Sequence, residues 1–250
     1  MKIRQNQIIS ELMEMQTQDK NCELLQYRRL ITAQQYIYLY DILTKYVDTG
    51  KVVLDWGSGN GHFSYFLLKS GYKVSGFSFD DFYLRQYFNE FDYEFKQGNE
   101  IQPSVIPYSD NKFDAVVSVG VLEHVRETGG NEIDSLQEIH RILKPGGYFI
   151  CYHFPNQFSW IEAIASLFPG KHHHTYRYTS KLIKTFCQAT NFELIEIKRY
   201  GILPRNIWGN LPIFLGNSPI LAKLFHLGDD ILKYPFSWIC QNYYFVVKKR

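Results

Sequence analysis

Val-Val-Leu-Asp-Trp-Gly-Ser-Gly-Asn-Gly, residues 52–61, joins an apolar run to three glycines at alternate positions. The apolar residues suit a parallel strand that is covered on both faces of a sheet. Gly57, Gly59 and Gly61 have no Cβ, so the backbone after the strand can approach a ligand closely. A helix after such a turn offers free N–H groups in its first turn. The stretch therefore predicts a strand, a glycine turn and a helix that bind a nucleotide-like cofactor.

Two details of this stretch favour S-adenosylmethionine over NAD as the cofactor. The spacing is Gly-x-Gly-x-Gly, and His62 stands where the dinucleotide fingerprint has glycine or alanine. Asp55 precedes the first glycine by two residues, where a carboxylate can meet the ammonium group of a ligand. The competing interpretation is that Asp55 accepts hydrogen bonds from the backbone of its own turn.

Two further blocks continue the pattern along the chain. Residues 106–125 contain Phe-Asp-Ala-Val-Val-Ser-Val-Gly-Val-Leu-Glu-His-Val, and residues 138–150 contain Leu-Lys-Pro-Gly-Gly-Tyr-Phe-Ile. With the glycine turn, these blocks resemble the class I S-adenosylmethionine-dependent methyltransferases, in the subgroup that modifies small molecules. The resemblance is close over residues 30–155 and looser over 175–200.

Alternating strand and helix patterns predict a parallel α/β sheet with right-handed crossovers. Strands are expected at 51–56, 72–78, 92–97, 113–119, 148–154, 192–198 and 242–248. Helices are expected at 61–70, from Asp80 or Asp81 onward, at 132–143 and at 179–190. The resemblance implies a Rossmann-like sheet of seven strands, mostly parallel, with helices on both faces and the last strand antiparallel.

The predicted domain organisation has an N-terminal helical extension or lid, residues 1–46, before a methyltransferase domain, residues 47–250. Within that domain, segments 153–178 and 201–241 are expected on the substrate side. Segment 201–241 is far too long for a hairpin connection, and it is rich in apolar residues. A helical insertion of this kind could cover the site, bind a partner or contact a membrane.

The resemblance implies that the cofactor is S-adenosylmethionine, with S-adenosylhomocysteine as the product. It assigns the methionine end to Asp55, Gly57, Gly59 and Gly61, and it implies that Trp56 also binds the cofactor. It also places the backbone of Val119, at the end of the fourth strand, beside the cofactor.

The ribose and adenine positions depart partly from the family pattern. The family usually has an acidic residue at the end of the second strand, but here the strand ends in Ser78 and Phe79. Either Ser78 contacts the ribose hydroxyls or Asp80 replaces it, although Asp80 also suits a helix cap. Asn99 and Glu100 follow the third strand, where the family often binds the adenine amino group; the competing role for Asn99 is to form the turn.

Methyl transfer from a sulfonium is an in-line displacement in which the cofactor carries the reactive group, so the protein mainly binds and aligns. His124 follows the fourth strand, and its unperturbed pKa suits a general base. His153, after the fifth strand, is a second catalytic candidate. The Glu123–His124 pair is common in the family whatever the substrate, which indicates a structural role at least as often as catalysis.

Segment 153–178 predicts a substrate lid. Trp160 lies in an amphipathic helix pattern, and His174, Tyr176 and Arg177 could bind a polar head group. The alternative is a solvated loop. No metal site is expected from the three histidines 172–174, because neighbours in sequence rarely face one ion.

Composition limits the partners and the compartment. Lysine and arginine number 27 against 25 acidic residues, so no nucleic-acid partner is expected. The four cysteines stand far apart, which suggests a reducing cytoplasmic setting, with membrane association as an alternative. The oligomeric state stays open.

The predicted function is methyl transfer to a small, partly apolar acceptor such as a lipid, a quinone-like ring or a lipid-linked sugar. The alternatives are a cofactor-binding adaptor or regulatory protein without methyl transfer, and a membrane-peripheral protein anchored by 201–241. An NAD-dependent oxidoreductase is the weaker alternative.

Overall fold

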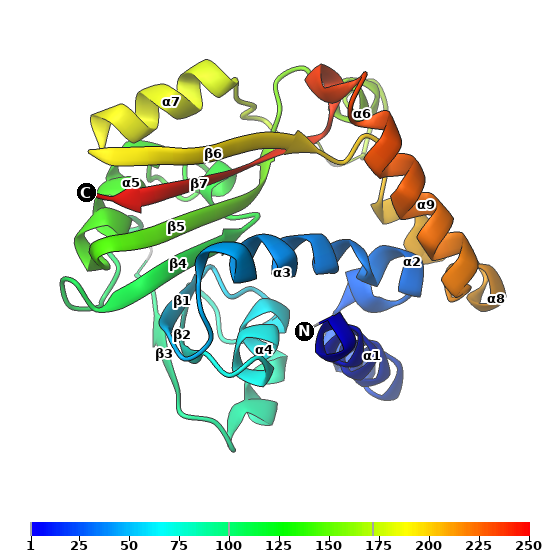
Figure 1. The fold of residues 1–250 in the computed structure, drawn as a ribbon, viewed down its shortest axis with the longest axis horizontal. Coiled ribbons are helices and arrows are strands. Elements are labelled where there is room, and N and C mark those ends of the chain that lie inside the picture. The colour runs from blue at the N-terminus through cyan, green and yellow to red at the C-terminus, as the bar shows by residue number, and fades with distance from the viewer. Residues whose placement is uncertain (1, 100, 172) are drawn as a thin grey trace.

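The computed structural model describes residues 2–99, 101–171 and 173–250, which form a sheet covered by helices (Figure 1). Its strands are β1 (Val52–Trp56), β2 (Lys73–Ser78), β3 (Tyr93–Gln97), β4 (Phe113–Val119), β5 (Leu143–Pro155), β6 (Phe192–Tyr200) and β7 (Asn242–Lys249). Their order across the sheet is β3-β2-β1-β4-β5-β7-β6. Neighbouring strands are parallel except around β7, which runs antiparallel to both β5 and β6. The predicted fold class is confirmed.

Helices cover both faces of this sheet and continue into the two extra segments. The α-helices are α1 (Lys2–Gln18), α2 (Leu30–Ala33), α3 (Gln35–Tyr46), α4 (His62–Lys69), α5 (Glu132–Ile142), α6 (Trp160–Ala165), α7 (Ser180–Ala189), α8 (Ile213–Gly216) and α9 (Pro219–Leu232). The 3₁₀ turns are η1 (Lys20–Cys22), η2 (Leu25–Tyr27), η3 (Tyr83–Phe88), η4 (Leu122–His124), η5 (Asn206–Asn210) and η6 (Ser237–Ile239).

Two apolar layers hold the sheet between its helices. One layer packs α1, α3 and α4 against one face, and the other packs α5 and α7 against the opposite face. Val53 belongs to the first layer and its neighbour Leu54 to the second, and both are fully buried. Because successive residues of a strand face opposite sides, a strand covered on both faces needs an unbroken apolar run. This explains why residues 52–54, at the start of the stretch that contains the glycine turn, are all apolar.

The helix predicted to begin at Asp80 or Asp81 is wrong, since this region forms only the short η3. Phe82 is extended, with φ −134° and ψ 149°. Its ring lies so close to Gly61 that a Cβ there would come within 2.4 Å of it. The Asp81 carboxylate accepts hydrogen bonds from the Phe82 N–H and from Arg85 instead of capping a helix. Packing of Phe82 on the glycine turn therefore overrides the local helix signal.

The insertion between β6 and β7 stands beside the N-terminal helices, with α9 running along the outside of α2 (Figure 1). His226 of α9 bonds the carbonyl of Ile31 through Nε2 at 3.1 Å. The Leu203 N–H donates to Asp229 at 2.7 Å, which ties the start of the insertion to α9. Among the helices of the described residues, none is both long enough and apolar enough to span a bilayer.

Candidate active site

The glycine turn between β1 and α4 requires glycine for two separate reasons. Gly57, Gly59 and Gly61 have φ values of +78°, +51° and +82°, in the region that side chains disfavour. At Gly57 a Cβ would also lie 2.2 Å from Cγ2 of Val121. Helix α4 begins directly after Gly61, so its first N–H groups lie at the carboxyl edge of the sheet.

Asp55 is buried beneath this turn, with only 1% of its surface exposed. Its Oδ2 accepts a hydrogen bond from the Ser64 hydroxyl at 2.7 Å. Burial raises the pKa of Asp55 to about 6, although the bond from Ser64 opposes the shift. A cationic ligand group at the turn would stabilise the ionised carboxylate, which is the chemistry expected of a site for the cofactor's ammonium group.

The residues predicted for the ribose and adenine lie at the ends of β2 and β3. Ser78 is half-buried, and the ring of Phe79 lies over Gly98, where a Cβ would come within 2.7 Å of it. Asn99 Oδ1 accepts a hydrogen bond from the Ile101 N–H at 2.9 Å, so Asn99 does form the turn. Its remaining role toward adenine stays a prediction. Glu100 lies outside the described residues.

The N-terminal extension lies directly on the glycine turn. Asn60 Nδ2 donates to the carbonyl of Glu23 at 2.8 Å, and Gln26 Nε2 lies 3.2 Å from Nδ1 of His62. The ring of Tyr27 is 5.6 Å from that of His62. Gln26 and His62 therefore lie beside the glycine turn. The sequence analysis used His62 only to choose between cofactors and predicted neither residue as part of the site.

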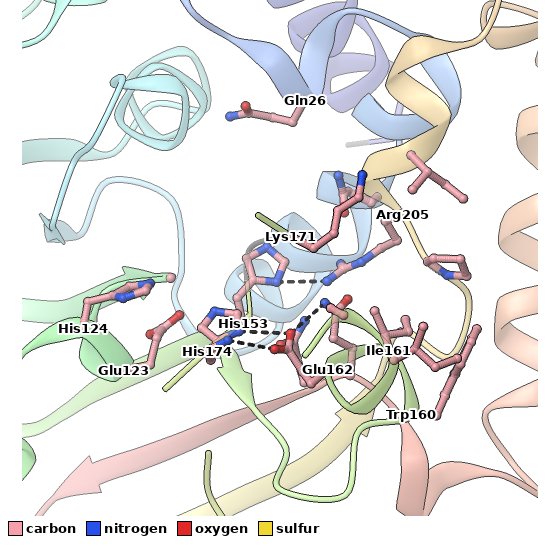
Figure 2. Close-up of a pocket in the computed structure, with 18 of the residues that line it drawn as sticks. Gln26, Glu123, His124, His153, Trp160, Ile161, Glu162, Lys171, His174 and Arg205 are labelled. Carbon is pink, nitrogen blue, oxygen red and sulfur yellow. Dashed lines mark hydrogen bonds and ion pairs between the residues drawn. The ribbon is translucent and has the colours of Figure 1, made fainter. Parts of the chain in front are cut away.

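A cavity of about 750 Å³ opens beside the ends of β4 and β5 (Figure 2). It brings together four of the predicted residues, namely His124, His153, Trp160 and His174. Tyr176 and Arg177 are not among the described lining residues, and the ring of Tyr176 instead packs under the guanidinium of Arg126 at 4.9 Å. Trp160 and His174 thus line the cavity, whereas Tyr176 packs against Arg126, and the role of these residues as a substrate lid stays a prediction.

His153 presents a proton donor to this cavity rather than a base. Its Nδ1 lies 2.9 Å from the Tyr200 hydroxyl and 3.3 Å from NH2 of Arg205. Because a guanidinium can only donate, Nδ1 is the acceptor and Nε2 carries the proton. Enclosure and the charge of Arg205 hold the pKa of His153 well below its usual range. Arg205, which imposes this state, comes from the insertion and was not predicted.

Two buried carboxyl groups, Glu123 and Glu162, make part of the cavity wall polar. Glu123 is 2% exposed, its burial raises its pKa to about 8, and its Oε2 has no hydrogen-bond partner among the described residues. Glu162 accepts from the N–H of His174 at 2.9 Å and pairs with its Nδ1 at 3.0 Å. Burial would raise the pKa of Glu162, but these bonds lower it to about 2. In the sequence, Glu162 follows Ser159 at capping-box spacing, a signal that points to a helix start and hides this second role.

A protein-family model described as a methyltransferase domain matches residues 25–197 of the chain. The chain belongs to this family and is an S-adenosylmethionine-dependent methyltransferase. The predicted class, enzymatic nature and cofactor are confirmed, and the dinucleotide alternative falls away.

Known relatives are distant. The chain is 29% identical over 163 residues to the tRNA U34 carboxymethyltransferase of Ruthia magnifica subsp. Calyptogena magnifica, covering 59% of this chain and 47% of that protein. It therefore spans about half the length of this relative. The fold resembles a Burkholderia thailandensis 1,6-didemethyltoxoflavin-N1-methyltransferase with bound S-adenosylhomocysteine (TM-score 0.54, 18% identity, 84% of this chain and 75% of that one). A Methanosarcina mazei S-adenosylmethionine-dependent methyltransferase is similar (TM-score 0.58, 18% identity, 84% and 97%).

Proposed function

We propose that this methyltransferase modifies a small acceptor that has a polar end and an apolar portion. The observation that carries this proposal is the division of the cavity into two ends. Glu123, His124 and His174 lie at one end, and Trp160 and Ile161 lie at the other (Figure 2). Further apolar lining comes from Ile164, Phe168 and Ile207, which are also exposed at the surface. An acceptor with matching halves would bury its apolar part against these side chains.

The protein's contribution is to align this acceptor with the cofactor. The sulfonium supplies the methyl group, so binding and orientation of the nucleophile account for most of what the side chains do. His153 Nε2–H and the guanidinium of Arg205 offer donors in the middle of the cavity, where they would hold an oxygen or a ring nitrogen. The predicted contribution of His124 as a base remains part of the proposal.

We expect a lipid-soluble product when the enzyme receives methyl-labelled S-adenosylmethionine and a total cell extract. The label should enter the organic phase after extraction. Trp160→Ala should raise KM for the extracted acceptor about tenfold, because its indole lines the cavity and anchors to the Ile202 carbonyl. Tyr87→Ala serves as the control, because Tyr87 is an exposed aromatic residue outside both the cavity lining and the insertion.

Label found in water-soluble products alone would contradict the proposed acceptor class. Label in tRNA would contradict it as well and would favour the activity of the Ruthia relative. The near balance of charge, +2 overall, gives no electrostatic reason to expect that outcome.

We further propose that the insertion rests on a membrane surface, from which such an acceptor would enter. Ile220, Leu224, Leu227 and Ile231 form one stripe of α9 and are 50 to 71% exposed. Exposed Ile207, in the same insertion, also lines the cavity, so the insertion has exposed apolar side chains both on α9 and at the site. A lipid surface would cover such a stripe along an amphipathic helix.

Flotation with vesicles of phosphatidylcholine and phosphatidylglycerol tests this contact. The protein should rise with the vesicles, and the double variant Leu224→Glu and Leu227→Glu should bind at least about tenfold less. The double variant Leu182→Glu and Thr185→Glu, on the exposed side of α7, introduces the same charge elsewhere and should float normally. Unmodified protein that stays at the bottom of the gradient, or a double variant that still floats, would contradict membrane contact.

A further inference from the structure

We infer that Glu123, His124 and His174 form a binding site for a divalent cation of the zinc class at the polar end of the cavity. One ligand atom from each side chain lies within 4.8 Å of the other two. The residues come from two separate segments, the turn after β4 and the loop before α7, which the fold brings together (Figure 2). The cation site does not depend on which acceptor the enzyme uses.

A second observation at Glu123 points to a ligand. Its Oε2 is buried and has no hydrogen-bond partner among the described residues, and the side chain as a whole is 2% exposed. A buried carboxylate oxygen without a partner costs free energy, because the water that it gives up is not replaced. A cation held at this oxygen would replace the missing partner and explain why the fold keeps the carboxyl group here.

Each of the two histidines has a carboxylate at Nδ1, which leaves Nε2 as the nitrogen that can bind a metal. Nδ1 of His124 lies 2.9 Å from Oε2 of Glu127, and Nδ1 of His174 lies 3.0 Å from Oε1 of Glu162. A neutral imidazole that donates from Nδ1 to a carboxylate has its lone pair on Nε2, so His124 would bind the cation there in place of acting as a general base. Metal-binding histidines are usually oriented by such an outer carboxylate, which also makes the ligating nitrogen more basic.

The donor set selects the kind of cation. Two imidazoles and one carboxylate suit zinc and its first-row neighbours, whereas magnesium and calcium prefer oxygen ligands. Tetrahedral zinc would need ligand atoms about 3.4 Å apart, so atoms that are now up to 4.8 Å apart must approach by up to about 1.4 Å. His124 is 35% and His174 16% exposed at the side chain, which leaves both rings room to rotate.

A cation with three protein ligands keeps a coordination position open. Because these residues line the cavity, that position would face the bound acceptor and could hold one of its oxygens. The cation would therefore define the polar end of the acceptor as an oxygen donor, and it would place that oxygen by geometry rather than by hydrogen bonds alone.

Calorimetric titration with zinc chloride tests the site without cofactor or acceptor, so its result is independent of the proposed acceptor. The 250-residue chain is first stripped with a chelator and dialysed. We expect one zinc ion per chain with a Kd in the micromolar range or below, and no binding of magnesium chloride at the same concentration. Glu123→Gln and His174→Ala should each weaken zinc binding at least about tenfold.

His173→Ala is the matched control, since this exposed neighbour of His174 is outside the group. It should bind zinc as the unmodified protein does. Far-UV circular dichroism of each variant confirms that it is folded. Three results would overturn the site: no saturable binding, binding that survives both Glu123→Gln and His174→Ala, or an equal loss in His173→Ala.

Discussion

Replacement of Gly57 by alanine is expected to lower the affinity for S-adenosylmethionine at least about 100-fold. The new Cβ would lie 2.2 Å from Cγ2 and 2.8 Å from Cγ1 of Val121, and no real Cβ tolerates such distances. The residue would also hold φ at +78°, which costs a side-chain-bearing residue roughly 1–2 kcal/mol. The turn must therefore move at the point where the backbone would approach the cofactor. Calorimetric titration with S-adenosylmethionine and S-adenosylhomocysteine measures the loss.

Gly50→Ala separates the effect of the positive φ from the effect of the steric clash. Gly50 has a similar φ of +88°, but a Cβ there meets nothing within 4 Å. This control should lose a little stability and retain cofactor binding. If Gly57→Ala bound the cofactor as tightly as Gly50→Ala, the glycine turn would not be the binding site.

Asp55→Asn is expected to change stability and cofactor binding in opposite directions. Burial raises the pKa of Asp55 from its ordinary value of 3.8 to about 6. Between these values the folded chain keeps the proton that the unfolded chain has lost, so the stability of the cofactor-free enzyme falls as pH rises. The total loss is about 3 kcal/mol, complete above pH 6. An asparagine cannot ionise and removes this dependence.

Urea unfolding of the cofactor-free protein between pH 4 and pH 8 measures this effect. The stability of Asp55→Asn relative to the unmodified protein should increase by about 2.4 kcal/mol over that range, since part of the total change lies below pH 4. Any constant offset from the new amide cancels in this comparison. Parallel profiles of stability against pH for the two proteins would show that folding does not raise the pKa of Asp55.

The same substitution should weaken S-adenosylmethionine binding about 10- to 100-fold, since it removes a charged partner for the ammonium group. Ser64→Ala is a useful comparison, because it removes the hydrogen bond to Oδ2 and keeps the charge. It should raise the pKa of Asp55 further and affect binding less. We therefore expect the ionised Asp55 to destabilise the cofactor-free enzyme and the ammonium group of the cofactor to stabilise it.

Local patterns were sufficient to predict the sheet. Six of the seven strands lie within two residues of their predicted bounds, because their apolar or alternating patterns are local and end at turn residues. Strand β5 begins at Leu143 rather than at 148, since Leu143 pairs with Phe113 across an irregularity that periodicity does not show. The prediction of a helix after β2 was wrong for a related reason. Phe82 packs on Gly61, and this tertiary contact is not visible in the local pattern.

The glycine turn is local in the chain, so its residue types alone predicted a cofactor site of the right class. Gly57, Gly59 and Gly61 all have positive φ, which glycine adopts most readily. The side chains that crowd Gly57 and Gly61, Val121 and Phe82, come from elsewhere in the chain and were not needed for the prediction. The sequence by itself therefore determined the fold, the enzyme class and the cofactor.

The acceptor side was decided only by tertiary structure. Glu123 and His174 are 51 positions apart in the chain, and Arg205 comes from the insertion, yet all three line one cavity. The partner that sets the protonation of His153, and the carboxylate that orients His174, are chosen by how the segments pack. Sequence spacing carries no record of such contacts, because side chains that far apart meet only after the sheet has formed.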